Sequence, residues 1–327
     1  MPNGEDLEAW PTSELNPRAF NTMIPGRVFG DSTAQIESLS MSRNGQMTIV
    51  STISDQVWLY DLEKSARART VWCEKYGAAH VRFIVDAKTA ILASTKGDHR
   101  ISYLDLVTIN YSRYYTGHEG RIIGLHTSPK DDLFLSISED QTIRFWEPLK
   151  EESLGTISLP STAVAEFDPT GSIFGVGCGG KLRLYDLKSY HYGPFLSVDI
   201  PTDDWVAMRF SPAGDTILIS TNTDKLLLLD AFTGAIKHVL QGHLNTTRLH
   251  LKGSFSPDAR YVVCGSSNKH IHIWSTETAQ IVHTFERSPH EQIPLLVEWN
   301  PAFISFLSAG KKLVLWNPVL EDMEKED

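Results

Sequence analysis

The chain has 327 residues, 41% hydrophobic and 21% charged, a composition ordinary for a folded globular protein. Its formal net charge is -10, whereas nucleic-acid-binding domains usually carry an excess of basic residues, so we expect no direct binding to DNA or RNA. Three isolated cysteines without a C-x-x-C pair indicate neither a disulfide framework nor a zinc site, and favour a reducing compartment. Apolar runs of strand length and an acidic start predict neither a membrane span nor a signal peptide.

The chain begins with a segment that shows no repeat pattern. Residues 1–23 contain Pro, Asn, Gly and acidic residues, and we predict that they form a flexible or docked N-terminal extension. The next segment, from Ile24 to Phe29, has the composition of a single strand and precedes the first repeat unit.

Seven stretches of alternating apolar residues follow along the chain. Their closing positions are Tyr60, Leu104, Trp146, Tyr185, Leu229, Trp274 and Trp316. Successive positions in that list lie 39 to 45 residues apart, and a period of about 40 to 45 residues is typical of a four-stranded propeller blade. Most units also contain a Pro, Gly or Asn turn between their first two strands, as at Ser128-Pro129. Only the second unit lacks this turn and has Val85 to Thr89 in its place.

The repeats predict an all-β fold, a seven-bladed β-propeller that spans residues 24–320 as one domain. The block after Trp316 contains no further strand, so the N-terminal strand would complete the last blade and close the ring, because a terminal blade otherwise leaves an unpaired edge. Residues 321–327 are predicted to form a short acidic tail.

The third unit combines Gly117-His118 with Ser136, Asp140 and Trp146, and this pattern resembles a WD repeat. The resemblance covers about residues 25 to 318 and implies that these side chains form a structural hydrogen-bond network inside the blade. The sixth unit has His243 and Trp274 but Cys264 and Asn268 at the other two positions. The second unit has Leu104 as its closing residue, and the remaining units match less well, so we expect the third blade to be among the best ordered, because a satisfied buried polar network adds rigidity.

No residue pattern indicates catalysis, a metal or a cofactor. His118, Ser136 and Asp140 have the composition of a hydrolase triad, but no G-x-S-x-G motif surrounds the serine. The twelve histidines show no metal-ligand spacing, and the glycines between Gly175 and Gly180 precede a strand, whereas a phosphate-binding loop opens a helix. The sequence therefore predicts a non-enzymatic interaction platform whose binding residues lie on loops held by a rigid ring.

Several segments spread along the chain resemble one particular WD-repeat subunit. They are Lys75-Tyr76-Gly77, Phe167-Asp168-Pro169, Tyr185-Asp186-Leu187 with Gly193-Pro194-Phe195, Ile217 to Asn222 with Asp230-Ala231-Phe232, and Trp299-Asn300-Pro301. This subunit is shared by COMPASS-type histone methyltransferase complexes and by a nuclear (PNUTS-type) protein phosphatase 1 complex of transcription termination. The resemblance implies a nuclear scaffold that docks a segment of a larger subunit and links a SET-domain methyltransferase, or protein phosphatase 1 with its targeting subunit, to RNA polymerase II. It also implies recognition of the phosphorylated polymerase tail.

Reading a phosphorylated segment requires cationic side chains on exposed loops, with aromatic residues as apolar anchors. The partner-binding candidates are Lys75, Arg82, Arg121 and Arg209 with Tyr76 and Trp205. Each of them taken alone is also an ordinary blade residue.

Two other functions are alternatives to a scaffold. A substrate receptor of a cullin ubiquitin ligase would carry Trp-Asp-x-Arg at a blade end, which neither Tyr185 to Lys188 nor Trp146 to Leu149 matches, and a hydrolase would use Ser136.

Overall fold

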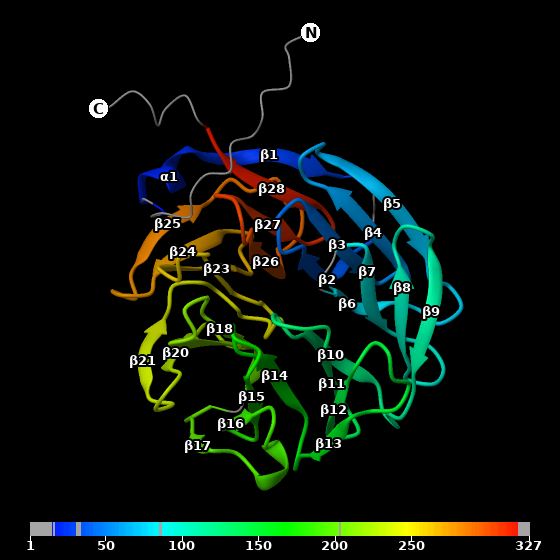
Figure 1. Cartoon of the computed structure of the whole chain (residues 1–327). Helices are drawn as coiled ribbons and strands as arrows, with labels where there is room; N and C mark the ends of the chain where they lie inside the picture. The colour runs from blue at the N-terminus through cyan, green and yellow to red at the C-terminus, as the bar shows by residue number, and fades with distance from the viewer. Residues whose placement is uncertain (1–14, 16, 31–33, 85–86, 203, 320–327) are drawn as a thin grey trace.

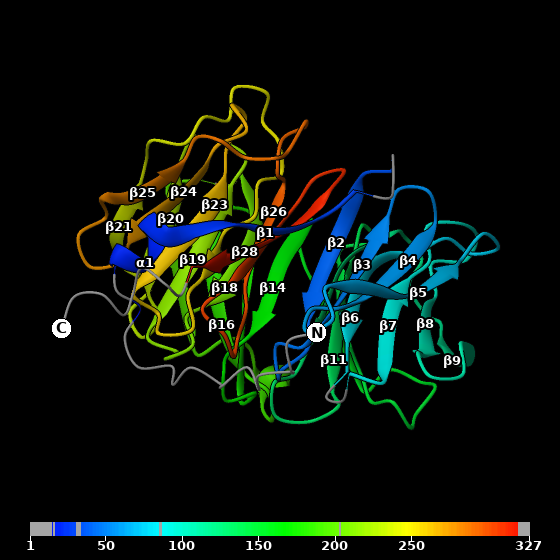
Figure 2. The same cartoon turned by 90° about the horizontal axis from the view of Figure 1, so that it is seen from above.

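The computed structural model describes residues 15, 17–30, 34–84, 87–202 and 204–319. Their strands form seven antiparallel sheets of four strands each, arranged as a ring (Figure 1). Figure 2 shows the ring from the side. The described helical segments are α1 (Pro17–Thr22) and the single 3-10 turn η1 (Tyr190–Tyr192). None of the helices in this part of the chain is long and apolar enough to cross a membrane. The predicted all-β, seven-bladed fold is therefore confirmed.

The strands of the first four blades follow one another in chain order. Blade 1 contains β2 (Ile36–Met41), β3 (Met47–Thr52), β4 (Gln56–Asp61) and β5 (Ala66–Trp72). Blade 2 contains β6 (Ala79–Phe83), β7 (Thr89–Ala93), β8 (Ile101–Asp105) and β9 (Asn110–Tyr115). Blade 3 contains β10 (Ile122–Thr127), β11 (Phe134–Ser138), β12 (Thr142–Trp146) and β13 (Gly155–Ser158). Blade 4 contains β14 (Ala163–Phe167), β15 (Ile173–Cys178), β16 (Lys181–Asp186) and β17 (Leu196–Asp199).

The same order continues through the last three blades until the ring is closed. Blade 5 contains β18 (Trp205–Phe210), β19 (Thr216–Thr221), β20 (Leu226–Asp230) and β21 (Ile236–Leu240). Blade 6 contains β22 (Ser254–Phe255), β23 (Tyr261–Gly265), β24 (Ile271–Ser275) and β25 (Ile281–Phe285). Blade 7 contains β26 (Leu296–Trp299), β27 (Phe306–Ala309), β28 (Leu313–Pro318) and β1 (Met23–Phe29).

The ring is closed as the sequence predicts, by a strand from the N-terminal end of the chain. β1 lies at the outer edge of blade 7 and pairs antiparallel with β28, from Phe29 opposite Leu313 to Met23 opposite Pro318 (Figure 1). The register shifts between Pro25 and Arg27. Such an irregularity fits a proline, which has no N–H to donate to the ladder and is tolerated at sheet edges and bulges.

The apolar side chains of the blades meet those of the neighbouring blades, so the core is divided into clusters around the ring. Blades 3 and 4, for example, share a buried cluster that includes Phe145 and Phe174, whose ring centroids are 5.0 Å apart. Trp58, Trp146, Trp274 and Trp316 are all fully buried in clusters of this kind. Burial of one large apolar side chain contributes about 1.5 to 3 kcal/mol. These buried tryptophans therefore hold adjacent blades together.

The turns between the first and second strands also join blades 7 and 1. Gly45 in the β2–β3 turn adopts a left-handed φ of +69°, and any side chain there would overlap Asn300. The Asn300 side chain donates a hydrogen bond from Nδ2 to the Gly45 carbonyl at 2.8 Å. The corresponding position of blade 2, where the sequence lacks a turn signal, includes residues 85 and 86, which lie outside the described residues.

The described part of the predicted N-terminal extension packs against blades 6 and 7. Phe20 of α1 is fully buried, and its ring lies edge-on to Tyr261 at a centroid distance of 4.8 Å. The Tyr261 hydroxyl donates a hydrogen bond to the Leu15 carbonyl at 3.3 Å. Residues 1–14 and 16 of the extension, and the acidic tail at 321–327, lie outside the described residues.

Candidate functional site

The third blade brings together the four residues that the sequence singles out as a network. His118 Nδ1 lies 2.8 Å from an oxygen of Asp140, and His118 Nε2 lies 2.6 Å from Ser136 Oγ. The indole N–H of Trp146 donates to the same Ser136 oxygen at 2.8 Å. Ser136 is fully buried between these partners. A nucleophile must be accessible to a substrate, and a fully buried serine is not. The arrangement therefore connects the strands of the blade and is poorly suited to catalysis.

Blade 7 corrects the expectation that the remaining blades match the pattern only weakly. His290 Nε2 lies 2.6 Å from Ser308 Oγ, which also accepts a hydrogen bond from the Trp316 indole at 2.8 Å. The sequence contained a usable signal, because serine follows histidine by 18 residues in both blades. Blade 7 has a Pro-His dipeptide in place of Gly-His, so the Gly-His pattern does not identify its histidine.

In blade 6 the closing tryptophan is held differently. Its indole N–H, from Trp274, donates to the backbone carbonyl of Gln241 at 2.8 Å. Cys264, at the position of the serine, is fully buried, and burial raises the pKa of its thiol to about 12. This blade therefore lacks the serine bridge.

The channel through the ring is lined by charged and polar side chains, many of them on the innermost strands. Each blade supplies at least one, and in chain order these are Glu37, Arg82, His126, Glu166, Arg209, Lys252 and Glu298. Four of the seven directly precede an aromatic residue near the end of the innermost strand, namely Arg82, Glu166, Arg209 and Glu298. A single charged residue within an otherwise apolar strand is the sequence signal for this lining, and of the seven residues Arg82 and Arg209 are among the candidates predicted from the sequence.

The deeper part of the channel is balanced by ion pairs. Arg209 lies 3.9 Å from Glu166 and 3.5 Å from Glu298, measured between side-chain nitrogen and oxygen atoms. His126 Nδ1 lies 2.9 Å from the same Glu166 carboxylate. Burial opposes ionisation of Glu166, but His126 and Arg209 together lower the pKa of its carboxyl below the ordinary value. Both glutamates therefore already have cationic or hydrogen-bonding partners.

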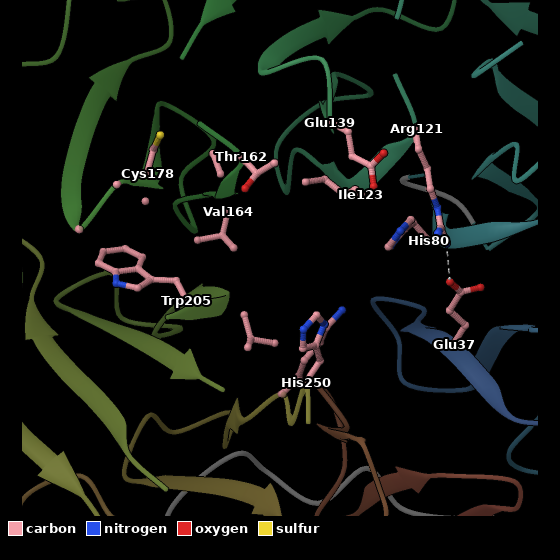
Figure 3. Close-up of a pocket in the computed structure, with 16 residues that line it drawn as sticks. Glu37, His80, Arg121, Ile123, Glu139, Thr162, Val164, Cys178, Trp205 and His250 are labelled. Carbon is pink, nitrogen blue, oxygen red and sulfur yellow. Dashed lines mark hydrogen bonds and ion pairs between the residues drawn. The ribbon is translucent and has the colours of Figure 1, made fainter. Parts of the chain in front are cut away.

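The mouth of the channel opens into a cavity of about 520 Å³. Most of its lining residues lie near the first residues of the innermost strands, and the others, Glu139 and Gly177 to Gly180, lie where the second strands of blades 3 and 4 end, so the cavity is at the end of the ring where the innermost strands begin. Figure 3 shows Trp205, His250, His80 and Arg121 around this cavity, with Arg121 linked to Glu37 at 3.3 Å. The mouth therefore combines cationic, acidic, imidazole and apolar groups, the acidic ones being Glu37 and Glu139.

Trp205 forms a fixed apolar wall of the cavity. Its indole N–H donates to the Thr202 carbonyl at 2.6 Å. Its six-membered ring lies directly over Gly177 of β15, so closely that a side chain at position 177 would overlap it. Gly177 thus leaves the room that the Trp205 ring occupies. The glycine-rich sequence alone does not indicate this role.

The structure divides the six partner-binding candidates into two groups. Arg82, Arg121, Arg209 and Trp205 line the channel and its mouth, and only Arg121 among these cations is strongly exposed. Lys75 and Tyr76 do not line the channel. They lie in the loop between β5 and β6, at the junction of blades 1 and 2.

Around Tyr76, cationic and aromatic side chains form a second cluster, which we call the rim cluster. The Arg100 guanidinium lies against both the Tyr76 and the Tyr114 rings, 4.3 and 4.9 Å from their centroids. Lys75 Nζ lies 4.8 Å from the Tyr76 ring centroid, and Asp98 pairs with Arg100. Stacking of this kind holds cationic and aromatic groups in place on a surface.

Comparison with known proteins places the fold and the sequence in one family. Residues 110–147 and 234–275 match the family described as "WD domain, G-beta repeat". The chain is 35% identical to "WD repeat-containing protein 82" of Drosophila melanogaster, covering 90% of this chain and 94% of that protein. It is 29% identical to "COMPASS component SWD2" of Saccharomyces cerevisiae, over 84% of this chain and 88% of that one. It is 27% identical to "Set1 complex component swd2" of Schizosaccharomyces pombe, over 86% and 92%. From its seven-bladed ring and these near full-length similarities, the chain belongs to the WD-repeat family that includes WD repeat-containing protein 82 and Swd2.

Proposed function

We propose that this protein is a non-catalytic scaffold subunit of a nuclear, COMPASS-type histone methyltransferase complex, in which it docks a segment of a larger subunit. The observation that carries the proposal is the near full-length similarity to two proteins named as components of the Set1 complex and of COMPASS. The geometry agrees with a scaffold, because the histidine–serine–aspartate set of blade 3 is enclosed in the fold. What remains available to a partner is the channel mouth and the exposed loops.

The rim cluster is the surface that we assign to the larger subunit. Stacked tyrosine and arginine side chains offer large contact areas with little loss of conformational entropy, and such residues carry much of the energy of protein interfaces. Tyr114 is 37% exposed, and Lys75 is exposed beside it. A partner segment with apolar and acidic side chains would complement this surface.

A second enzyme partner extends the proposal. The segments that resemble the shared WD-repeat subunit support an additional place in a protein phosphatase 1 complex with its targeting subunit, and thereby in transcription termination. In that setting the protein would also contact the phosphorylated tail of RNA polymerase II. Arg121 and Lys75 are the candidates on exposed loops for this contact.

The test is affinity purification of the tagged full-length chain from nuclear extract, with quantitative mass spectrometry of the proteins that accompany it. A SET-domain methyltransferase is expected, and recovery of protein phosphatase 1 with a targeting subunit would establish the second partner. Recovery of cullin adaptors with neither enzyme would overturn the proposal.

The docking surface is tested in the same assay by Tyr76→Ala, which should reduce recovery of the larger subunit. Tyr192→Ala is the matched control, because Tyr192 lies in η1 on blade 4, is 86% exposed and belongs to neither candidate surface. Equal recovery with both variants would exclude the rim cluster.

A further inference from the structure

An apolar groove lies at the seam between blades 7 and 1, on the face of the ring where the innermost strands end. It has a volume of about 220 Å³, and its apolar walls are Leu62, Phe303, Ile304, Leu315 and Pro318. The channel mouth is at the opposite end of the innermost strands, so the groove is a separate feature. Phe303 and Ile304 are only partly buried, which leaves apolar surface accessible at this seam.

The polar groups of the groove divide into one that is already bonded and one that can accept a further hydrogen bond. The Asn300 side-chain oxygen accepts hydrogen bonds from the backbone N–H groups of Ala302 and Phe303, at 3.0 and 3.1 Å. Glu63 is exposed at the rim, and its carboxylate accepts a hydrogen bond from Gln46 Nε2 at 2.6 Å. A carboxylate has about four acceptor sites, so Glu63 can accept another donor. The groove therefore suits a large apolar side chain that carries one N–H.

The N-terminal extension enters the propeller beside this groove. The Leu15 N–H donates to the Asp258 carboxylate at 3.3 Å, and the Tyr261 hydroxyl donates to the Leu15 carbonyl at 3.3 Å. Leu15 is buried in the apolar cluster of blades 6 and 7, and Ile304 packs against that same cluster. Ile304 also lines the groove. One side chain therefore separates the groove from the cluster that anchors Leu15.

The segment that precedes Leu15 contains a residue of the required chemistry within reach. Trp10 is the one aromatic residue among residues 1–14, and it lies five residues before Leu15. Five extended residues span at most about 17 Å, enough to pass Ile304 and reach the groove. Pro11 follows Trp10 and disfavours helical backbone at Trp10, which favours an extended approach.

The C-terminal end of the chain fits the groove less well. The Val319 N–H donates to the Thr22 carbonyl at 3.1 Å, which holds the last described residue beside α1. Residues 320–327 contain five carboxylates and no aromatic side chain. They offer neither an indole for the apolar walls nor a favourable charge beside Glu63.

We propose that residues 1–14 dock on their own propeller, with the Trp10 indole in this groove and its N–H directed to Glu63. A buried aromatic side chain removes about 150 to 250 Å² from water, and a buried indole N–H usually finds an acceptor. The tether supplies the segment at an effective concentration in the millimolar range, so a modest affinity is sufficient. The contact covers the seam at which β1 closes the ring, and it is independent of the proposed function.

The experiment is fluorine NMR of the full-length chain, with its eight tryptophans replaced by 5-fluorotryptophan. The Trp10 resonance is assigned by its loss in Trp10→Phe. We expect it away from the position that a free, fluorinated peptide of residues 1–14 gives. A resonance at the free-peptide position would overturn the inference and leave the groove to a partner. A position that changes with protein concentration would overturn it in favour of a second copy of the chain.

Phe303→Asp locates the docked segment, because it introduces a charge into the partly buried wall of the groove. It should move the Trp10 resonance to the free-peptide position. Phe232→Asp is the matched control, since Phe232 is 75% exposed on blade 5 and does not line the groove, and it should leave the resonance in place. A Trp10 resonance that stays in place in both variants would show that the segment is held elsewhere, and would overturn the assignment.

A competition experiment tests the same contact without changing the propeller. An unlabelled peptide of residues 1–14, added at several millimolar to match the effective concentration of the tether, should shift the Trp10 resonance toward the free position. The same peptide with Trp10→Ala should not shift it. Equal effects of the two peptides, or no effect of either, would contradict docking through the indole.

Discussion

Blades 3 and 7 hold their buried tryptophans with the same serine and histidine geometry but differ in what supports the histidine. The histidine–serine distance is 2.6 Å in both, and the tryptophan–serine distance is 2.8 Å in both. Blade 3 adds Asp140 behind the histidine. Blade 7 has no equivalent residue, because its hairpin is two residues shorter. The last paired residues before the turn are Ile137 with Ile143 in blade 3, and Ala309 with Leu313 in blade 7.

The missing aspartate changes the electrostatics of the histidine. In blade 3, burial resists ionisation of Asp140, but hydrogen bonds from Thr142 and His118 hold the pKa of its carboxyl well below the usual range. That carboxylate partly offsets the effect of burial on the pKa of His118. In blade 7, burial and the positive charge of Lys312 lower the pKa of His290 to about 4. The serine–histidine–tryptophan bridge therefore forms without an aspartate, and the aspartate adds a connection to the turn.

The largest effect should come from Asp140→Ala. The carboxylate accepts hydrogen bonds from His118, from the backbone N–H groups of Glu119 and Thr142, and from the Thr142 hydroxyl. A single hydrogen bond to a charged group contributes about 1.5 to 3 kcal/mol, so we expect the loss of the whole set to lower the unfolding free energy by at least about 3 kcal/mol. Denaturant titration measures it. Asp140→Asn, which keeps acceptor capacity, should lose less, and equal losses would mean that the charge contributes nothing.

Removing the serine should have a similar effect in both blades. Ser136→Ala and Ser308→Ala each break one histidine bond and one tryptophan bond inside the core, and we expect a loss of about 2 kcal/mol for each by denaturant titration. A much smaller loss for Ser308→Ala would show that the bridge of blade 7 needs an aspartate. An unchanged transition for Ser136→Ala together with loss of an esterase signal would revive the hydrolase alternative.

The fold was predictable because its signals are repeated seven times. The closing apolar stretches and the Pro and Gly turns each recur at one period, so a weak match in one unit is supported by the others. The bridge of blade 7 was missed because its histidine follows proline and its hairpin lacks the aspartate. A search by the 18-residue interval from histidine to serine finds both bridges.

The channel was predictable only in part, because its geometry depends on which side chains of different blades converge. The prediction that Arg82 and Arg209 lie on exposed loops is wrong, because they belong to innermost strands and face the channel. Lys252 is not among the predicted candidates, since it lies before the two-residue strand β22, where no strand pattern is visible in the sequence. Convergence of residues more than forty positions apart is set by the ring closure and not by local spacing.

Lowering the pH should expose the difference between the two histidines. The pKa of His290 is about 4 in the folded chain and about 6.5 when unfolded, so protons bind the unfolded state first as the pH falls. Stability is therefore unaffected above pH 6.5 and declines between pH 6.5 and 4. From pH 7 to 5.5 the unmodified chain should lose about 1 kcal/mol more than His290→Gln. Denaturant titration at both pH values measures the difference.

The matched control for this pH experiment is His118→Gln. Asp140 opposes the lowering of the His118 pKa, so His118→Gln should flatten the pH dependence less than His290→Gln does. Equal flattening would show that burial dominates and that the aspartate leaves the titration unaffected.

The smallest effect should come from Lys312→Gln, which separates the contribution of charge from that of burial. Lys312 Nζ lies 2.6 Å from Glu291 on the surface, and an exposed pair of this kind contributes little to stability, so the transition at pH 7 should not move measurably. Its charge nevertheless lowers the pKa of His290, and removing it should raise that pKa and reduce the loss of stability near pH 5. Lys64→Gln breaks the exposed Lys64–Asp61 pair on blade 1 and should leave the pH profile unchanged. If both variants keep the pH profile of the unmodified chain, burial alone lowers the pKa of His290. Asp140 is then the electrostatic difference between the histidines of the two blades.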